Sequence, residues 1–99
     1  MKVSGVKPPN PGEAIRVTVD GSPVAVFNVS GVLLAVGAMC THVGGPVDQG
    51  KVHGTTVTCP WHGSEFDLRT GAVVRGPATQ ALKSYRVRAE ADGLVIDPN

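Results

Sequence analysis

The middle of this sequence differs from its two ends, and that contrast limits the folds the chain can adopt. Residues 37–80 contain eight of the 13 glycines, both cysteines and all three histidines. Outside them, residues 15–19 alternate apolar and polar side chains as a half-buried strand does. Residues 85–89 and 94–96 are typical of a closing hairpin. We therefore expect strands from both chain ends to form a base that carries an inserted, glycine-rich loop region.

The remaining pattern favours an all-β chain with a single domain over residues 1–99. Aromatic residues are scarce, turn residues are frequent and no convincing amphipathic helix is present. A length of 99 residues leaves no room for a second domain. Residues 1–12, which hold three prolines, are predicted to be a turn-rich arm. Further strands are predicted at residues 24–29, 32–36, 55–59, 66–68 and 72–74.

Composition and charge exclude several classes of protein. The net charge is +1, and nine basic and eight acidic residues are mixed along the chain without a basic stripe, which disfavours nucleic-acid binding. The longest apolar run, residues 32–40, is far shorter than the roughly 20 residues of a membrane span. The first residues lack the apolar core of a signal peptide, so we expect a cytoplasmic protein. The small apolar surface favours a monomer.

Two short motifs each pair one thiol with one imidazole. Cys40-Thr41-His42 and Cys59-Pro60-Trp61-His62 are separated by 16 residues. A single cysteine or histidine is usually a buried or hydrogen-bonded side chain with no further role. A lone disulfide is not expected in a reducing compartment. Two such pairs in one loop region therefore indicate a metal site.

The order of these ligands favours a centre with two metal ions. Zinc accepts two thiolates and two imidazoles, but zinc fingers usually group the cysteines together and the histidines together. Here each motif supplies one of each, so both loops can reach both metals. Cys40 and Cys59 would bind one iron and His42 and His62 the other, as in a Rieske [2Fe–2S] cluster. Spacing alone leaves a structural zinc-binding module open.

Longer stretches of sequence carry a resemblance to the Rieske family. Residues 40–45 and 59–67 resemble its two cluster-binding loops, and residues 76–78, which contain Pro77, are similar to its proline loop. The resemblance implies a small Rieske-type β-sandwich base with an inserted cluster-binding subdomain at about residues 38–78. It also implies one [2Fe–2S] cluster per chain, bound by the four ligands named above.

Departures from the respiratory members of that family point to a different group within it. Those members carry an extra cysteine in each loop, where this chain has Gly45 and Trp61, and a tyrosine where it has Phe66. The chain therefore resembles the soluble Rieske-type ferredoxins of bacterial ring-hydroxylating oxygenase systems. Ser64 keeps a hydroxyl that can point at a bridging sulfide and raise the potential. We expect a potential in the lower part of the Rieske range, which spans about −150 to +300 mV.

The resemblance implies an electron carrier and not an enzyme. Such a carrier takes one electron from a flavin-dependent reductase and passes it to a terminal oxygenase through transient contacts. The electron would leave at the exposed edges of His42 and His62, while Trp61 and Pro77 would shield the cluster and line the docking surface. The chain is too short to contain the oxygenase's own mononuclear iron site and substrate domain.

Two other hypotheses come from different classes of protein. The small subunit of a nitrite reductase-like complex has a similar fold, and a structural zinc-binding module would use the same four ligands. Three acidic residues near the ligands, Asp48, Glu65 and Asp67, could contribute to partner recognition or be merely solvated. The third histidine, His53, is predicted to be a surface loop residue.

Overall fold

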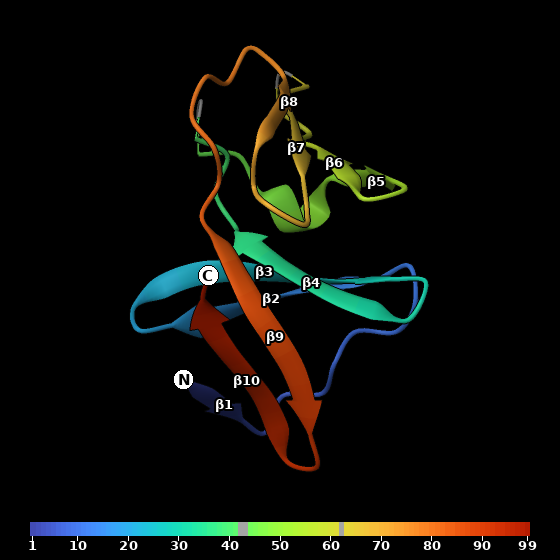
Figure 1. Ribbon diagram of the computed structural model, residues 1–99, viewed down its shortest axis with the longest axis vertical. Helices are drawn as coiled ribbons and strands as arrows, with labels where there is room; N and C mark the ends of the chain where they lie inside the picture. Colours follow the sequence, from blue (N-terminus) through green and yellow to red (C-terminus); the bar gives the residue numbers. More distant parts are fainter. Residues whose placement is uncertain (42–43, 62) are drawn as a thin grey trace.

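The computed structural model describes residues 1–41, 44–61 and 63–99, and nearly all of its regular structure is β-strand. Six strands form one antiparallel sheet in the order β1-β10-β9-β4-β3-β2, and four form a second in the order β5-β6-β7-β8 (Figure 1). The all-β prediction is confirmed. The elements are β1 (Lys2–Ser4), β2 (Ala14–Val19), β3 (Ser22–Val29), β4 (Val32–Gly37), the 3-10 helix η1 (Val47–Gln49), β5 (Lys51–His53), β6 (Thr56–Thr58), β7 (Glu65–Asp67), β8 (Val73–Arg75), β9 (Ser84–Glu90) and β10 (Gly93–Pro98).

The six-stranded base sheet folds over on itself. Val17 and Val19 of β2 share one buried core with Leu94 and Ile96 of β10, although these strands lie near opposite sides of the sheet order. The sheet must therefore curl until its two ends face each other across that core. This gives the two layers of the predicted sandwich base from a single sheet.

Strand β3 is buried on both faces, and this property joins the two parts of the molecule. Val24 and Val26 point into the core of the base, whereas Ala25 and Phe27 point into a second core. Since successive side chains of a strand face opposite ways, a continuous apolar run is what such a strand requires. The base therefore presents an apolar floor on which the inserted residues pack.

The second core holds both cysteines of the sequence. Cys40 and Cys59 are buried beside Val57 of β6 and Phe66 of β7. Ala78, from the segment that leads into β9, belongs to the same hydrophobic core. The two cysteines are thus fixed by the packing of the inserted region.

Two predictions about local structure are wrong. Residues 1–12 contain strand β1, in which Val3 pairs with Leu94, because the N-terminal residues find their partner at the far end of the chain. His53 is exposed as expected, but it lies in β5 opposite Thr56 and not in a loop. In both places the pairing partner decides the conformation, and short-range composition does not reveal that partner.

The two parts of the molecule lie along its longest axis. The four-stranded sheet and the segment before β9 occupy one end, while both chain termini lie with the base sheet (Figure 1). The principal extents are 39 × 27 × 19 Å. No helix in the described part of the chain has the length and apolar character needed to cross a membrane.

Candidate metal centre

The first cysteine begins a short loop, and two backbone hydrogen bonds close this loop. The Cys40 N–H donates to the carbonyl of Gly45 at 2.8 Å, and the Gly44 N–H donates to the carbonyl of Cys40 at 2.7 Å. Gly44 has a φ of +74°, a conformation that glycine adopts without strain. Cys40 therefore has a fixed backbone at the mouth of the loop.

The second cysteine loop is built in the same way. The Cys59 N–H donates to the carbonyl of Ser64 at 2.7 Å, and the Gly63 N–H donates to the carbonyl of Cys59 at 3.2 Å. Gly63 has a φ of +78°, at the position equivalent to Gly44. Both loops thus start with a cysteine and close five residues later. The two predicted imidazole ligands, His42 and His62, lie outside the described residues.

The two thiols meet although they are far apart in sequence. Cys40 and Cys59 are buried in the same core and form no disulfide with each other. Burial raises the pKa of the Cys59 thiol, a backbone hydrogen bond from Trp61 lowers it, and the neighbouring Cys40 raises it. A pair of free thiols held together in this way is half of a four-ligand metal site.

The rest of the ligand set is not completed by the described residues. Within residues 1–41, 44–61 and 63–99, no three histidine, cysteine or acidic side chains gather around one point. A four-ligand centre therefore needs two more donors, and the sequence predicts them at His42 and His62. The chemistry of the two thiols fits the iron that carries cysteine ligands in a Rieske cluster.

Gly45 leaves space for the second thiol. A Cβ atom added at Gly45 would lie 2.8 Å from the Cys59 sulfur and 3.1 Å from Cβ of Trp61. Contacts this short are not tolerated between non-bonded heavy atoms, so any larger residue would push the sulfur away. Gly45 and Trp61, the positions where respiratory members carry their extra cysteines, therefore face each other here.

Two further residues predicted beside the cluster are buried, Phe66 in the second core and Ser64 against Ala78 of that core. Ser64 is fully buried, and its Oγ accepts a 3.0 Å hydrogen bond from the Ala78 N–H. Because Oγ is the acceptor there, the hydroxyl proton remains available to donate elsewhere. Phe66 is also fully buried and supplies no hydroxyl.

Residues 76–82, which we call the covering segment, are tied to both cysteine loops. Ala78 contacts Ser64 of the second loop, as described above, and Thr41 Oγ1 of the first loop donates to the carbonyl of Gln80 at 2.6 Å. Pro77 is exposed next to the buried Ala78. Sequence reasoning missed Thr41, because nothing in its local context indicates a partner 39 positions away.

The three acidic residues near the ligands each have a side-chain partner within the chain. Arg16 donates to Asp48 at 2.9 Å and also to the carbonyl of Ala38, which leads into the first cysteine loop, at 3.4 Å. Asp67 pairs with Arg69, and Glu65 accepts from Thr58. Asp48 and Asp67 are thus each paired with an arginine, whereas Glu65 has a hydroxyl group as its hydrogen-bond partner.

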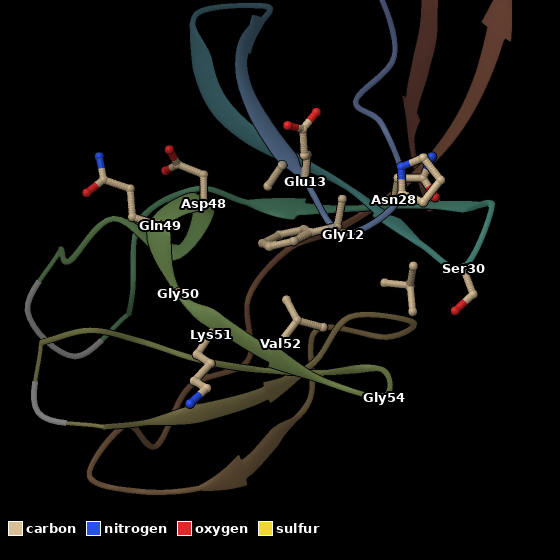
Figure 2. A pocket seen from close by; sticks show the side chains of 14 residues that line it. Gly12, Glu13, Asn28, Ser30, Asp48, Gln49, Gly50, Lys51, Val52 and Gly54 are labelled. Atoms are coloured by element: carbon tan, nitrogen blue, oxygen red, sulfur yellow. The ribbon is translucent and has the colours of Figure 1, made fainter.

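A cleft of about 570 Å³ lies between the base and the small sheet, but it does not contain the metal ligands. Its wall includes Glu13, Asp48 and Lys51, and the Lys51 side chain points away from the two carboxylates (Figure 2). Phe27 and Val52 supply apolar wall. Charged groups do not converge in the cleft, so we assign it no ligand.

Comparison with known proteins agrees with this geometry. The family model of the Rieske [2Fe-2S] domain matches residues 1–86. The ferredoxin component of the naphthalene 1,2-dioxygenase system from Pseudomonas aeruginosa is 35% identical over 86 residues, which cover 87% of this chain and 83% of the relative.

Solved structures extend the likeness over almost the whole chain. The ferredoxin of carbazole 1,9a-dioxygenase from Nocardioides aromaticivorans superposes with a TM-score of 0.87 at 26% identity, covering 99% of this chain and 98% of its own. A complex of reduced oxygenase and oxidized ferredoxin in carbazole 1,9a-dioxygenase matches with a TM-score of 0.82 at 29% identity, covering 97% and 99%.

Proposed function

This chain belongs to the Rieske [2Fe-2S] domain family, and we propose that it is a one-electron carrier serving the terminal oxygenase of a ring-hydroxylating dioxygenase system. The observation that carries this proposal is the pair of buried, adjacent thiols on two loops of the same design. The relatives are ferredoxin components, which are carriers and not catalytic subunits. The chain is accordingly an electron-transfer protein and not an enzyme.

We assign the four ligands as follows. Cys40 and Cys59 hold one iron as thiolates, and His42 and His62 hold the other as neutral imidazoles. When bound, the [2Fe–2S] cluster accepts and returns a single electron. Neutral imidazoles in place of two thiolates make the centre less negative, so it should accept an electron more readily than a plant-type ferredoxin near about −400 mV.

The surrounding residues position and tune this centre. Gly45 leaves the Cys59 sulfur free to approach the iron, and the backbone of Trp61 acts to lower the pKa of the same thiol. Because Ser64 Oγ accepts from the Ala78 N–H, its own proton is free and would be able to donate to a sulfide of the cluster. The covering segment excludes water from one side, because Thr41 and Ser64 tie it to both loops.

The partners belong to the same proposal. A neighbour of the same fold is known in complex with its oxygenase, and we infer the same kind of acceptor here. A flavin-dependent reductase is the proposed donor. Both contacts should be small and transient, burying less than about 1,200 Å² in total. We further propose a cytoplasmic monomer.

Electron paramagnetic resonance of the reduced protein, with iron and zinc counted on the same sample, tests the proposal. The protein is purified without oxygen and reduced with dithionite. We expect an anisotropic signal averaging below the free-electron value, with about two irons per chain. A silent spectrum with about one zinc per chain would establish a structural zinc module instead.

A further inference from the structure

Three segments at the end of the molecule that carries the metal loops contain no charged residue. Residues 37–47, 59–64 and 76–82 include no aspartate, glutamate, lysine or arginine. All nine basic and all eight acidic residues lie outside these three segments. We call the surface formed by the described parts of these segments the tip. Its neutrality is a property of three separate stretches of sequence that the fold brings together.

Two large apolar side chains are exposed on the tip, one directly before the first cysteine loop and one within the second. Met39 is 51% exposed and Trp61 is 52% exposed. They flank adjacent glycines: a Cβ at Gly44 would lie 3.5 Å from Cε of Met39, and one at Gly45 would lie 3.1 Å from Cβ of Trp61. Exposed apolar residues are ordinary one at a time, but a cluster marks an interaction surface.

Several charges next to the tip have partners within the chain, whereas Arg75, directly before the covering segment, is exposed and belongs to none of the ion pairs of the described residues. Asp48 is held by Arg16 and Asp67 by Arg69, so neither is free to attract a cationic surface. Lys83, just after the covering segment, lies 5.4 Å from the centre of the Tyr85 ring.

Further ion pairs lie on the base sheet, at the other end of the molecule. Lys2 pairs with Asp92 and Glu90, and Arg88 also pairs with Glu90. These ion pairs reduce the field of the surrounding charges, and the three segments of the tip add no charge of their own.

We propose that the oxygenase docks on the tip by apolar contact, with Met39 and Trp61 as the two anchors. The matching face of the partner is uncharged and apolar, because a charged group buried against the tip would lose water without gaining a counter-charge. Association then depends little on salt and proceeds without electrostatic steering. This inference rests on the proposed carrier function and specifies the chemistry of its partner.

Electron transfer to cytochrome c, a cationic acceptor protein, tests the neutrality of the tip. The rate is followed by stopped flow between about 20 mM and about 500 mM NaCl, where screening removes long-range attraction. We expect the rate to change by less than about twofold. Met39→Glu should accelerate the reaction at low salt and restore a salt dependence. A wild-type rate that falls more than about tenfold with salt would overturn the proposal.

The docking anchors are tested with the oxygenase component of a naphthalene 1,2-dioxygenase system as acceptor. We expect Met39→Ala and Trp61→Ala each to lower the second-order rate by about five- to tenfold, at low and high salt alike. Val32→Ala is the matched control, because Val32 is 58% exposed at the start of β4 on the base sheet.

Cluster content separates failure of docking from failure of the carrier function. The iron count and the resonance spectrum of each variant are measured first, and only variants with the wild-type cluster are compared. Equal losses in Val32→Ala and the tip variants would contradict the proposal, as would tip variants with wild-type rates. Wild-type protein that reduces cytochrome c but not this oxygenase would also contradict it.

Discussion

At position 45 the backbone passes so close to the Cys59 thiol that only glycine fits. The space that a methyl group would need is taken by the Cys59 sulfur on one side and by Trp61 on the other. Gly45 also closes the first cysteine loop, since its carbonyl accepts from the Cys40 N–H. One residue thereby sets the position of both thiols.

Replacing Gly45 with alanine should therefore damage the metal site more than the fold. The new methyl group would force the Cys59 sulfur to move, and we expect the iron content of Gly45→Ala to fall to less than about half of wild type. Gly37→Ala is the control, because a Cβ there meets no atom closer than 3.9 Å. Equal iron in both variants, measured after identical reconstitution, would argue against this role of Gly45.

The Ser64 hydroxyl should raise the reduction potential of the centre, and removing it tests this effect. Ser64→Ala removes a hydrogen-bond donor that favours the more negative reduced state, so the potential should fall. We expect the reduction potential to fall by tens of millivolts, since about 59 mV corresponds to a tenfold change in a one-electron equilibrium. Protein-film voltammetry measures the potential, and Ser22→Ala, on the exposed start of β3, is the control. An unchanged potential in Ser64→Ala would exclude this role.

Among the structural elements, the covering segment has little regular structure of its own and depends on its two anchors. Residues 76–82 form no strand. Hydrogen bonds with Thr41 on one loop and Ser64 on the other hold them in place. Ala78 and Leu82 add apolar contact with the second core. The segment is thus positioned by the very loops that it covers.

Thr41→Val should loosen the covering segment while keeping the shape of the side chain. The lost hydrogen bond to the Gln80 carbonyl costs about 1 kcal/mol, and we expect cluster absorbance to bleach several-fold faster in the presence of an iron chelator. Thr79→Val, on an exposed residue of the same segment, is the control. Equal bleaching rates in the two variants would show that this anchor does not protect the centre.

The sequence predicted those elements that have a periodic pattern or a paired motif. It failed where the conformation of a segment depends on a partner far away in the chain. The mainly apolar run at residues 24–29 predicted the strand that is β3. Strand β1 was not predicted, because its pairing with β10 is set at the opposite end of the chain. The spacing of the two motifs pointed to Cys40 and Cys59, which the fold places in one buried core. Thr41 and Met39 were missed, since their roles depend on loops that meet only in the folded protein.

On the scale of the whole molecule, the first and last strands of the base sheet are fastened together. The N-terminal ammonium pairs with Asp97, and β1 lies along β10. A hydrogen bond from that ammonium lowers the pKa of the Asp97 carboxyl, and the nearby Arg86 and Arg88 contribute in the same direction. A carboxyl with a depressed pKa stabilises the fold above its ordinary pKa of 3.8 and loses that contribution as pH falls.

Asp97→Asn should accordingly be less stable than wild type near neutral pH and lose less stability on acidification. Urea unfolding between about pH 7 and about pH 3 measures the difference, which should shrink as pH falls through the carboxyl range. Asp20→Asn, which removes the same charge from an exposed turn, should keep the wild-type slope. Parallel curves for wild type and Asp97→Asn would mean that this ion pair adds nothing.

Since β3 has a core on each face, the base and the metal-bearing region cannot melt independently. Removing the inserted residues would leave Ala25 and Phe27 bare, so a shortened base should aggregate in place of folding. Heating the intact protein should give one cooperative transition, in which the colour of the cluster and the β-sheet signal disappear together. Moving the cysteine loops to another scaffold therefore requires moving the apolar face of β3, with Ala25 and Phe27, as well.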